Sequence, residues 1–75
     1  MKATTYRGHD IDRVLRERLH MAGCYPLRAQ NGDGEDAGEI WFTPHLNREF
    51  MLEARVIDPI TANAALRRAG MEEAF

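Results

Sequence analysis

The chain has 75 residues, of which 44% are hydrophobic and 29% are charged, which is the composition of a folded globular domain rather than of a disordered chain. A chain of this length buries only about 60% of the surface that its unfolded form exposes. We therefore expect a single domain over residues 1–75 with a small hydrophobic core, whose function resides on its surface. Ten basic and twelve acidic residues give a net charge of −2, without a run of Lys or Arg. Strong binding to a phosphate backbone is therefore disfavoured.

Membrane and disulfide-stabilised classes are also disfavoured. The N-terminal residues MKATTYRGHD contain no apolar signal core, and no apolar run approaches the length of a membrane span. The single cysteine, Cys24, has no partner for an internal disulfide, and its place after Gly23 at a predicted helix end favours a half-buried thiol. We expect a cytoplasmic protein that does not bind a membrane.

The first periodic segment is HDIDRVLRERLHMAG, in which apolar residues recur at helical spacing. This pattern predicts a helix at about 10–22, with Asp10 as its N-cap and Gly23 as its left-handed stop. On the polar face, Asp12 and Arg16 are spaced for an i,i+4 ion pair.

Three strands are predicted next, at about 25–30 (YPLRAQ), 39–44 (EIWFTP) and 49–57 (EFMLEARVI). Pro26 places the first of them at a sheet edge or at its own start, because proline cannot donate to the ladder. The short link PHLNR predicts that the second and third strands are antiparallel neighbours.

The last periodic segment, DPITANAALRRAG, predicts a helix at about 59–69 with Asp58 as N-cap and Gly70 as stop. The tail MEEAF is expected to fold back and bury Met71 and Phe75. The element order is thus α-β-β-β-α, an α+β fold with two helices on one face of a three-stranded antiparallel sheet.

From residue 39 onward the sequence resembles the HicA family, small toxins of bacterial and phage toxin–antitoxin modules. The resemblance rests on EIWFTPHLNREF and TANAALRRAGMEEAF, and it covers roughly the last half of the chain. It implies a double-stranded-RNA-binding-like fold and a metal-independent endoribonuclease that cleaves mRNA. In many members a Gly-Ser-His triplet stands directly before EIW, and its His serves as the general acid or base. Imidazole suits this role because it titrates near neutral pH.

This chain departs from the family at the catalytic position. Directly before Glu39 stand Asp36, Ala37 and Gly38, within the acidic glycine loop NGDGEDAG at 31–38, which we expect to be mobile. The resemblance therefore implies a divergent HicA-like member that has lost the catalytic His at Ala37 and Gly38. Its basic surface is also reduced, since only Arg55 remains in the segment where relatives carry several basic residues.

The other titratable groups are weak substitutes. Glu39 and His45 are the fallback candidates for catalysis, and Glu35 and Asp36 for binding, although acids of a flexible loop are usually solvated. His9, His20 and His45 are not spaced with Cys24 or with acids as a metal site requires, so we predict no metal and no cofactor.

Trp41 has two interpretations. It either anchors the sheet against a helix or, together with Met51 and Thr43, forms a binding anchor on the open face of the sheet. Strand alternation places Arg55 on that same face as Met51, where it would serve as a second anchor.

Two functions follow. The favoured one is a non-enzymatic HicA-like binding protein that acts through protein–protein interaction, on a HicB-type antitoxin or as a phage-type inhibitor, for example an anti-CRISPR, of a basic nucleic-acid-binding host protein. The alternative is an active endoribonuclease toxin. In the favoured case the chain binds RNA weakly if at all, and it is a monomer or a small homo-oligomer. RNA affinity that persists at physiological salt would favour the alternative.

Overall fold

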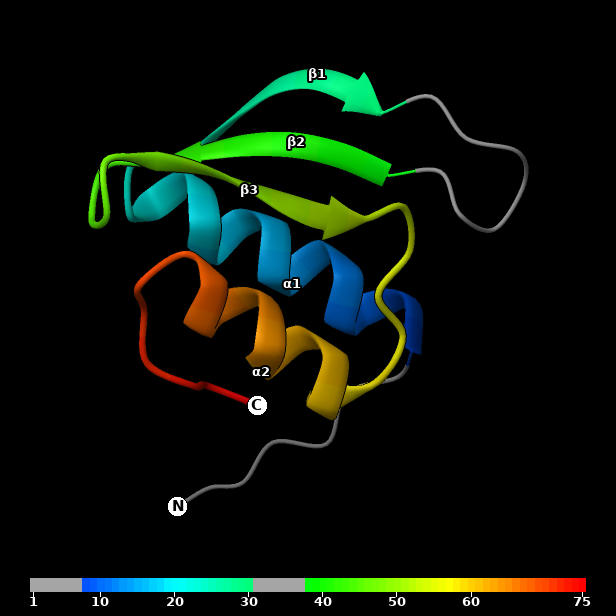
Figure 1. Cartoon of the computed structure of the whole chain (residues 1–75). Helices are drawn as coiled ribbons and strands as arrows, with labels where there is room; N and C mark the ends of the chain where they lie inside the picture. The colour runs from blue at the N-terminus through cyan, green and yellow to red at the C-terminus, as the bar shows by residue number, and fades with distance from the viewer. Residues whose placement is uncertain (1–7, 31–37) are drawn as a thin grey trace.

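The computed structural model describes residues 8–30 and 38–75. The elements are α1 (Gly8–Met21), β1 (Tyr25–Gln30), β2 (Gly38–Thr43), β3 (Arg48–Glu53) and α2 (Pro59–Arg68). Both helices lie on one face of the sheet (Figure 1). This arrangement confirms the predicted α-β-β-β-α order and fold class. The expected mobile loop falls almost wholly at 31–37, outside the described residues.

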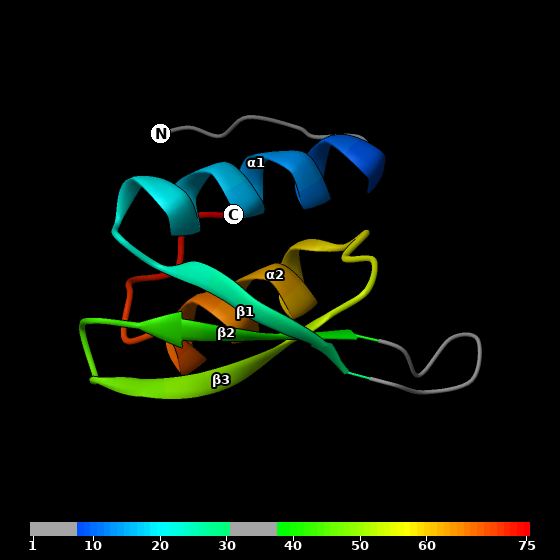
Figure 2. The ribbon, with the colours of Figure 1, turned by 90° about the horizontal axis from the view of Figure 1, so that it is seen from above.

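The sheet is antiparallel with β2 in the middle, between β1 and β3 (Figure 2). Trp41 on β2 is paired with Phe50 on β3, while Phe42 is paired with Glu49. The register of β1 against β2 shifts between Pro26 and Arg28. A bulge of this kind bends an edge strand and interrupts its regular pairing.

The core lies between the helices and the inner face of the sheet. Its buried apolar residues are Ile11, Leu15, Leu19, Cys24, Trp41, Phe50, Leu52, Val56, Ala62, Ala65, Leu66 and Ala69. The small side chains of Ala62, Ala65 and Ala69 allow the backbone of α2 to pack closely against the neighbouring elements. Cys24 is 1% exposed, so the thiol is fully buried rather than half-buried as predicted.

Two element ends differ from the predictions. The first helix begins at Gly8, which places Asp10 inside the first turn instead of at the N-cap. The third strand ends at Glu53 instead of continuing to residue 57, because side chains of α1 form hydrogen bonds with the backbone groups that follow Glu53. Arg16 Nη2 donates to the carbonyl of Ala54 at 3.1 Å, and Val56 N donates to the Asp12 carboxylate at 3.0 Å.

The second helix begins and ends as predicted. The Asp58 carboxylate accepts a hydrogen bond from Thr61 N at 2.8 Å, which caps the first turn, and Gly70 follows the last turn with a φ of 80°. Met71 and Phe75 of the following tail pack against the core, which confirms the predicted fold-back.

Candidate binding surface

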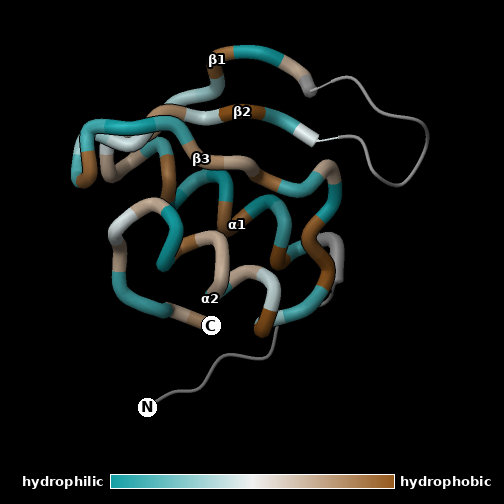
Figure 3. The backbone as a smooth tube through the Cα atoms, in the orientation of Figure 1, coloured by the Kyte–Doolittle hydropathy of each residue, from teal (hydrophilic) through white to brown (hydrophobic). Residues whose placement is uncertain are grey.

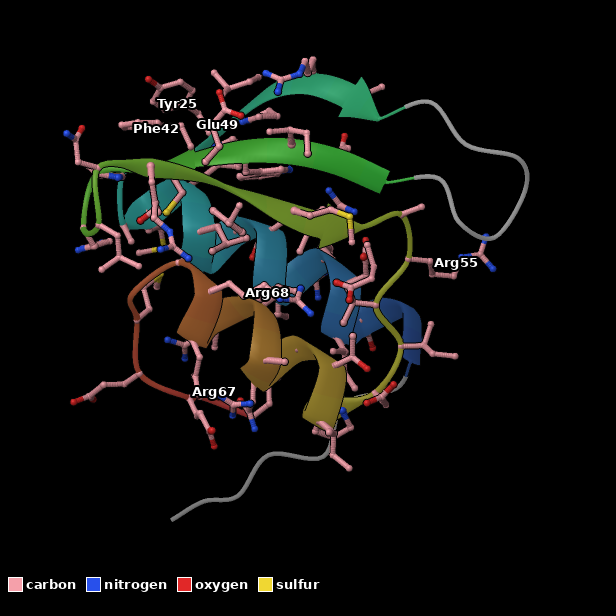
Figure 4. The ribbon with its side chains drawn as sticks, viewed as in Figure 1. Tyr25, Phe42, Glu49, Arg55, Arg67 and Arg68 are labelled. Atoms are coloured by element: carbon pink, nitrogen blue, oxygen red, sulfur yellow. The ribbon has the colours of Figure 1, made fainter. Side chains whose placement is uncertain are left out.

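Two rows of paired side chains lie on the face of the sheet that points away from the helices. Strand pairing gives the first row as Tyr25, Phe42 and Glu49, and the second as Arg28, Ile40 and Met51. We call these six residues the open sheet face. Tyr25, Phe42 and Glu49 project from the sheet on the side opposite the helices in Figure 4.

Four of these six side chains are apolar or aromatic. Tyr25 is 47% exposed and Met51 39%, and Ile40 and Phe42 on the central strand are half-buried. The Tyr25 and Phe42 rings are in contact, with centroids 5.5 Å apart. Figure 3 shows hydrophobic positions within β2. A contiguous apolar surface that the fold leaves uncovered is typical of an interaction site.

An ion pair spans the open sheet face. Arg28 Nη2 on β1 lies 3.0 Å from Glu49 Oε1 on β3, so the two side chains meet across the central strand. Both are more than half exposed, at 58% and 51%. Exposed pairs of this kind contribute about 0–1 kcal/mol, so an incoming surface separates them at little cost.

Trp41 does not belong to this face. It is 2% exposed on the inner face, its Nε1 donates to Glu39 at 3.1 Å, and its ring lies 5.1 Å from that of His20. Thr43 is buried beside it on the same inner face. The prediction of an exposed Trp41–Thr43 anchor is therefore wrong, and the core interpretation of Trp41 is confirmed. Alternation separates the faces of a strand but does not say which one packs on the helices.

The other predicted binding residues are distributed differently. Met51 lies on the open sheet face, opposite Ile40. Arg55 follows the end of β3 and projects away from the sheet (Figure 4), so it does not share a face with Met51 as predicted. Glu35, Asp36 and Ala37 lie outside the described residues.

Among the six residues of this surface, sequence analysis named only Met51 as a binding residue and missed the other five, which are Tyr25, Arg28, Ile40, Phe42 and Glu49. Two of the missed residues, Tyr25 and Phe42, form the aromatic contact of this face. The available signal was their matching position: an aromatic residue at the start of one strand and another near the end of its antiparallel neighbour can face each other.

Glu39 is held in place by hydrogen bonds from Trp41 and Arg16. Desolvation alone would raise the pKa of its carboxyl group, but the hydrogen bonds from Trp41 Nε1 and Arg16 and the charge of Arg16 outweigh it and lower the pKa. Arg16 also binds Asp12 at 2.9 Å. A carboxylate whose pKa lies below its ordinary value is ionised at neutral pH and is poorly matched to proton transfer there.

Gly38 is the first residue of β2 and is buried. A Cβ atom at this position would lie 2.8 Å from the carbonyl oxygen of Leu52, which is a backbone atom and cannot move aside freely. The pairing of β2 with β3 therefore requires glycine here.

The structure places His45 and His20 on different segments of the chain. His45 lies in the turn after β2, roughly 20 Å along the chain from Glu39 at strand spacing. His20 is at the end of α1 against Trp41. Within residues 8–30 and 38–75, no three His, Cys, Asp or Glu side chains are grouped as metal ligands.

None of the described helices is long and apolar enough to cross a membrane. Comparisons of the chain with protein-family models, with curated proteins and with solved structures found no match.

Proposed function

We propose that this chain is a non-enzymatic binding protein that acts through protein–protein contacts of the open sheet face. The observation that carries the proposal is that Tyr25 and Met51 are exposed and Ile40 and Phe42 are only half-buried on the open sheet face, while the opposite face of the same sheet holds a complete core. Aromatic residues and Met are enriched in the centres of protein interfaces, and charges are depleted there.

The α-β-β-β-α order is the one that the resemblance to HicA implies, and it supports a double-stranded-RNA-binding-like, HicA-like assignment. On that basis the partner is a HicB-type antitoxin or a basic nucleic-acid-binding host protein, and the chain works in the cytoplasm. In the second case it acts as a phage-type inhibitor, such as an anti-CRISPR.

The chemistry of the former catalytic position supports binding over RNA cleavage. Gly38 has no space for a side chain, and Glu39 is committed to Arg16 and Trp41. Among the described residues, His20 packs on the Trp41 ring and no His side chain is hydrogen-bonded to Glu39, so the carboxylate has no imidazole partner for proton transfer near neutral pH. The net charge of −2 further opposes approach of RNA.

The test compares the wild type with Phe42→Lys on the open sheet face and with Ile60→Lys as a matched control, because Ile60 is 81% exposed on α2. Proteins that co-purify from a bacterial host are identified, and each is produced alone and titrated with the three variants. We expect Phe42→Lys to weaken the reconstituted complex at least tenfold, in line with loss of an interface anchor, and Ile60→Lys to have no effect. Equal binding by both variants, or RNA cleavage by the wild type, would overturn the proposal.

A further inference from the structure

The six residues of the open sheet face are electrically neutral and self-complementary, because they include one cation, Arg28, and one anion, Glu49, on opposite edge strands, while Glu53 at the end of β3 pairs with Arg68 of α2. A second copy of the same surface presents the complement of each charge.

We propose that in the absence of another partner this face docks against the open sheet face of a second copy, forming a symmetric dimer that a foreign partner has to displace. The inference rests on the proposed function of the face and adds a regulatory step to it. Self-association covers the apolar side chains in the fraction of the chain that is dimeric, and the partner competes with it.

The strand order determines how two such faces fit. A twofold axis that runs along β2, between the two sheets, places β1 of one copy over β3 of the other. Arg28 then lies over the position of Met51 in the second copy, because the two residues share a row. Glu49 of the second copy is two residues away on the same strand, within reach of the long guanidinium side chain.

On dimerisation, the Arg28–Glu49 ion pair within each chain is therefore replaced by the same ion pair between the two chains. In the single chain, Arg28 reaches its own Glu49 across the central strand at 3.0 Å. In the dimer each Arg28 reaches Glu49 of the other copy, while Ile40 and Phe42 lie along the axis and face their own counterparts. The apolar contacts are gained while the number of ion pairs stays the same.

Pairing through the sheet edges is less favourable than pairing through the face. At the outer edge of β3, the carbonyl of Met51 accepts from Arg68 Nη1 at 3.2 Å, and the carbonyl of Glu53 accepts from Arg16 Nη2 at 3.2 Å. At the outer edge of β1, Pro26 offers no donor and the adjacent bulge breaks the regular ladder.

The size of the surface sets the strength of the dimer. Three strands of six residues give a flat area of about 300 Å² at ordinary strand spacing and rise. A standard stable interface buries about 800 Å² per partner. We therefore expect a dissociation constant in the range of about 0.1–1 mM, weak enough for a specific partner to compete.

The experiment uses charge reversal on the full chain, with sedimentation equilibrium from 10 μM to about 2 mM, a range chosen to bracket that constant. Arg28→Glu and Glu49→Arg each leave two like charges on the face, so each variant alone should be monomeric throughout. Mixed one to one, the two variants present only complementary charges to each other, and they should form a heterodimer. The double variant R28E/E49R should self-associate like the wild type.

A matched control uses the exposed pair of Arg13 and Glu17 on α1, whose atoms are 3.4 Å apart. Arg13→Glu and Glu17→Arg change the net charge by the same amounts without touching the open sheet face. Each should dimerise like the wild type, and their mixture should show no added affinity. Circular dichroism of every variant verifies that it is folded.

A wild type that stays monomeric at 2 mM, single variants that still dimerise, or a mixture that does not associate would each overturn the dimer. These results leave the proposed function untouched, because Phe42→Lys still tests binding of the foreign partner. Conversely, a dimer that responds as described, together with a partner that ignores Phe42→Lys, would retain the self-association and reject the proposed partner site.

Discussion

Arg16 of α1 and Glu39 of β2 form an ion pair that ties the first helix to the central strand across 23 residues of sequence. The same guanidinium binds Asp12 on its own helix and the carbonyls of Glu53 and Ala54 at the end of β3. Burial alone would lower the pKa of Arg16, but the bonds to Asp12 and Glu39 raise it. One side chain thus holds together a helix, the middle strand and an edge strand.

Replacing Glu39 with Gln should lower the free energy of unfolding by about 1 kcal/mol or less at pH 7, because the carboxylate is partly exposed and its charge is screened. The pKa of Glu39 is lowered by folding from its ordinary value of 4.5, so its ionised form favours the folded state. That contribution is complete above pH 4.5 and is lost as the pH falls through the folded pKa. Urea unfolding followed by Trp41 fluorescence at pH 7 and pH 3 measures it.

For Glu39→Gln, the difference from the wild type should therefore shrink at pH 3. Glu17→Gln is the control, since Glu17 is 61% exposed and pairs only with a neighbouring turn of its own helix. A difference between Glu39→Gln and the wild type that grows on acidification would contradict the assigned ion pair.

Introducing the HicA-type residues with A37S/G38H should not produce more than weak RNA cleavage. The new side chain at residue 38 would meet the Leu52 carbonyl oxygen, 2.8 Å from its Cβ, and forcing it in should cost about 1–3 kcal/mol of stability. Cleavage of labelled RNA and urea unfolding are measured together, with Ala37→Ser alone as control. Efficient cleavage by a fully stable double variant would show that the strand pairing tolerates the imidazole.

Asn63→Ala should release the C-terminal tail. The Asn63 side chain accepts from the backbone N–H of Ala74 at 3.1 Å and of Phe75 at 3.0 Å, and it donates to the Phe75 carbonyl at 3.1 Å. Their loss should cost about 1–2 kcal/mol, since the site is partly exposed. Amide exchange at Ala74 and Phe75 should accelerate, whereas Glu72→Ala, an exposed change in the same tail, should leave it unchanged. Unaltered exchange in Asn63→Ala would mean that apolar packing alone holds the tail.

Thr43→Val should destabilise the fold by about 1–3 kcal/mol although it conserves volume, because it removes a buried hydrogen-bond donor. The Thr43 hydroxyl donates to the carbonyl of Ala69 at 2.6 Å and joins the end of β2 to the end of α2. Thermal unfolding measures the loss. Thr43→Ser, which keeps the hydroxyl and loses one methyl group, should cost about 0.8 kcal/mol. If Thr43→Val were as stable as Thr43→Ser, the hydrogen bond from Thr43 to Ala69 would not contribute measurably to the stability of the fold.

Local sequence determined the elements and their order. The apolar spacing of the first helix, the Asp58 cap and the Gly70 stop are short-range signals, and each is confirmed in the structure. These features depend on residues within one or two turns of each other, so a single pass along the chain reveals them. The fold-back of Phe75 was predictable because a closing aromatic residue has only the nearby core to pack against.

Tertiary structure decided which face of the sheet is buried and where β3 ends. The side chains of the adjacent residues Trp41 and Phe42 point to opposite faces of the sheet, and strand alternation alone allows either of them to face the core. The apolar residues of the two helices pack on the face that carries Trp41, so Phe42 lies beside Tyr25 on the open sheet face. Likewise β3 stops at Glu53 because Asp12 and Arg16, about 40 residues earlier, take its next backbone groups. Such partners are brought together only by the packing of the whole chain, and no local pattern encodes them.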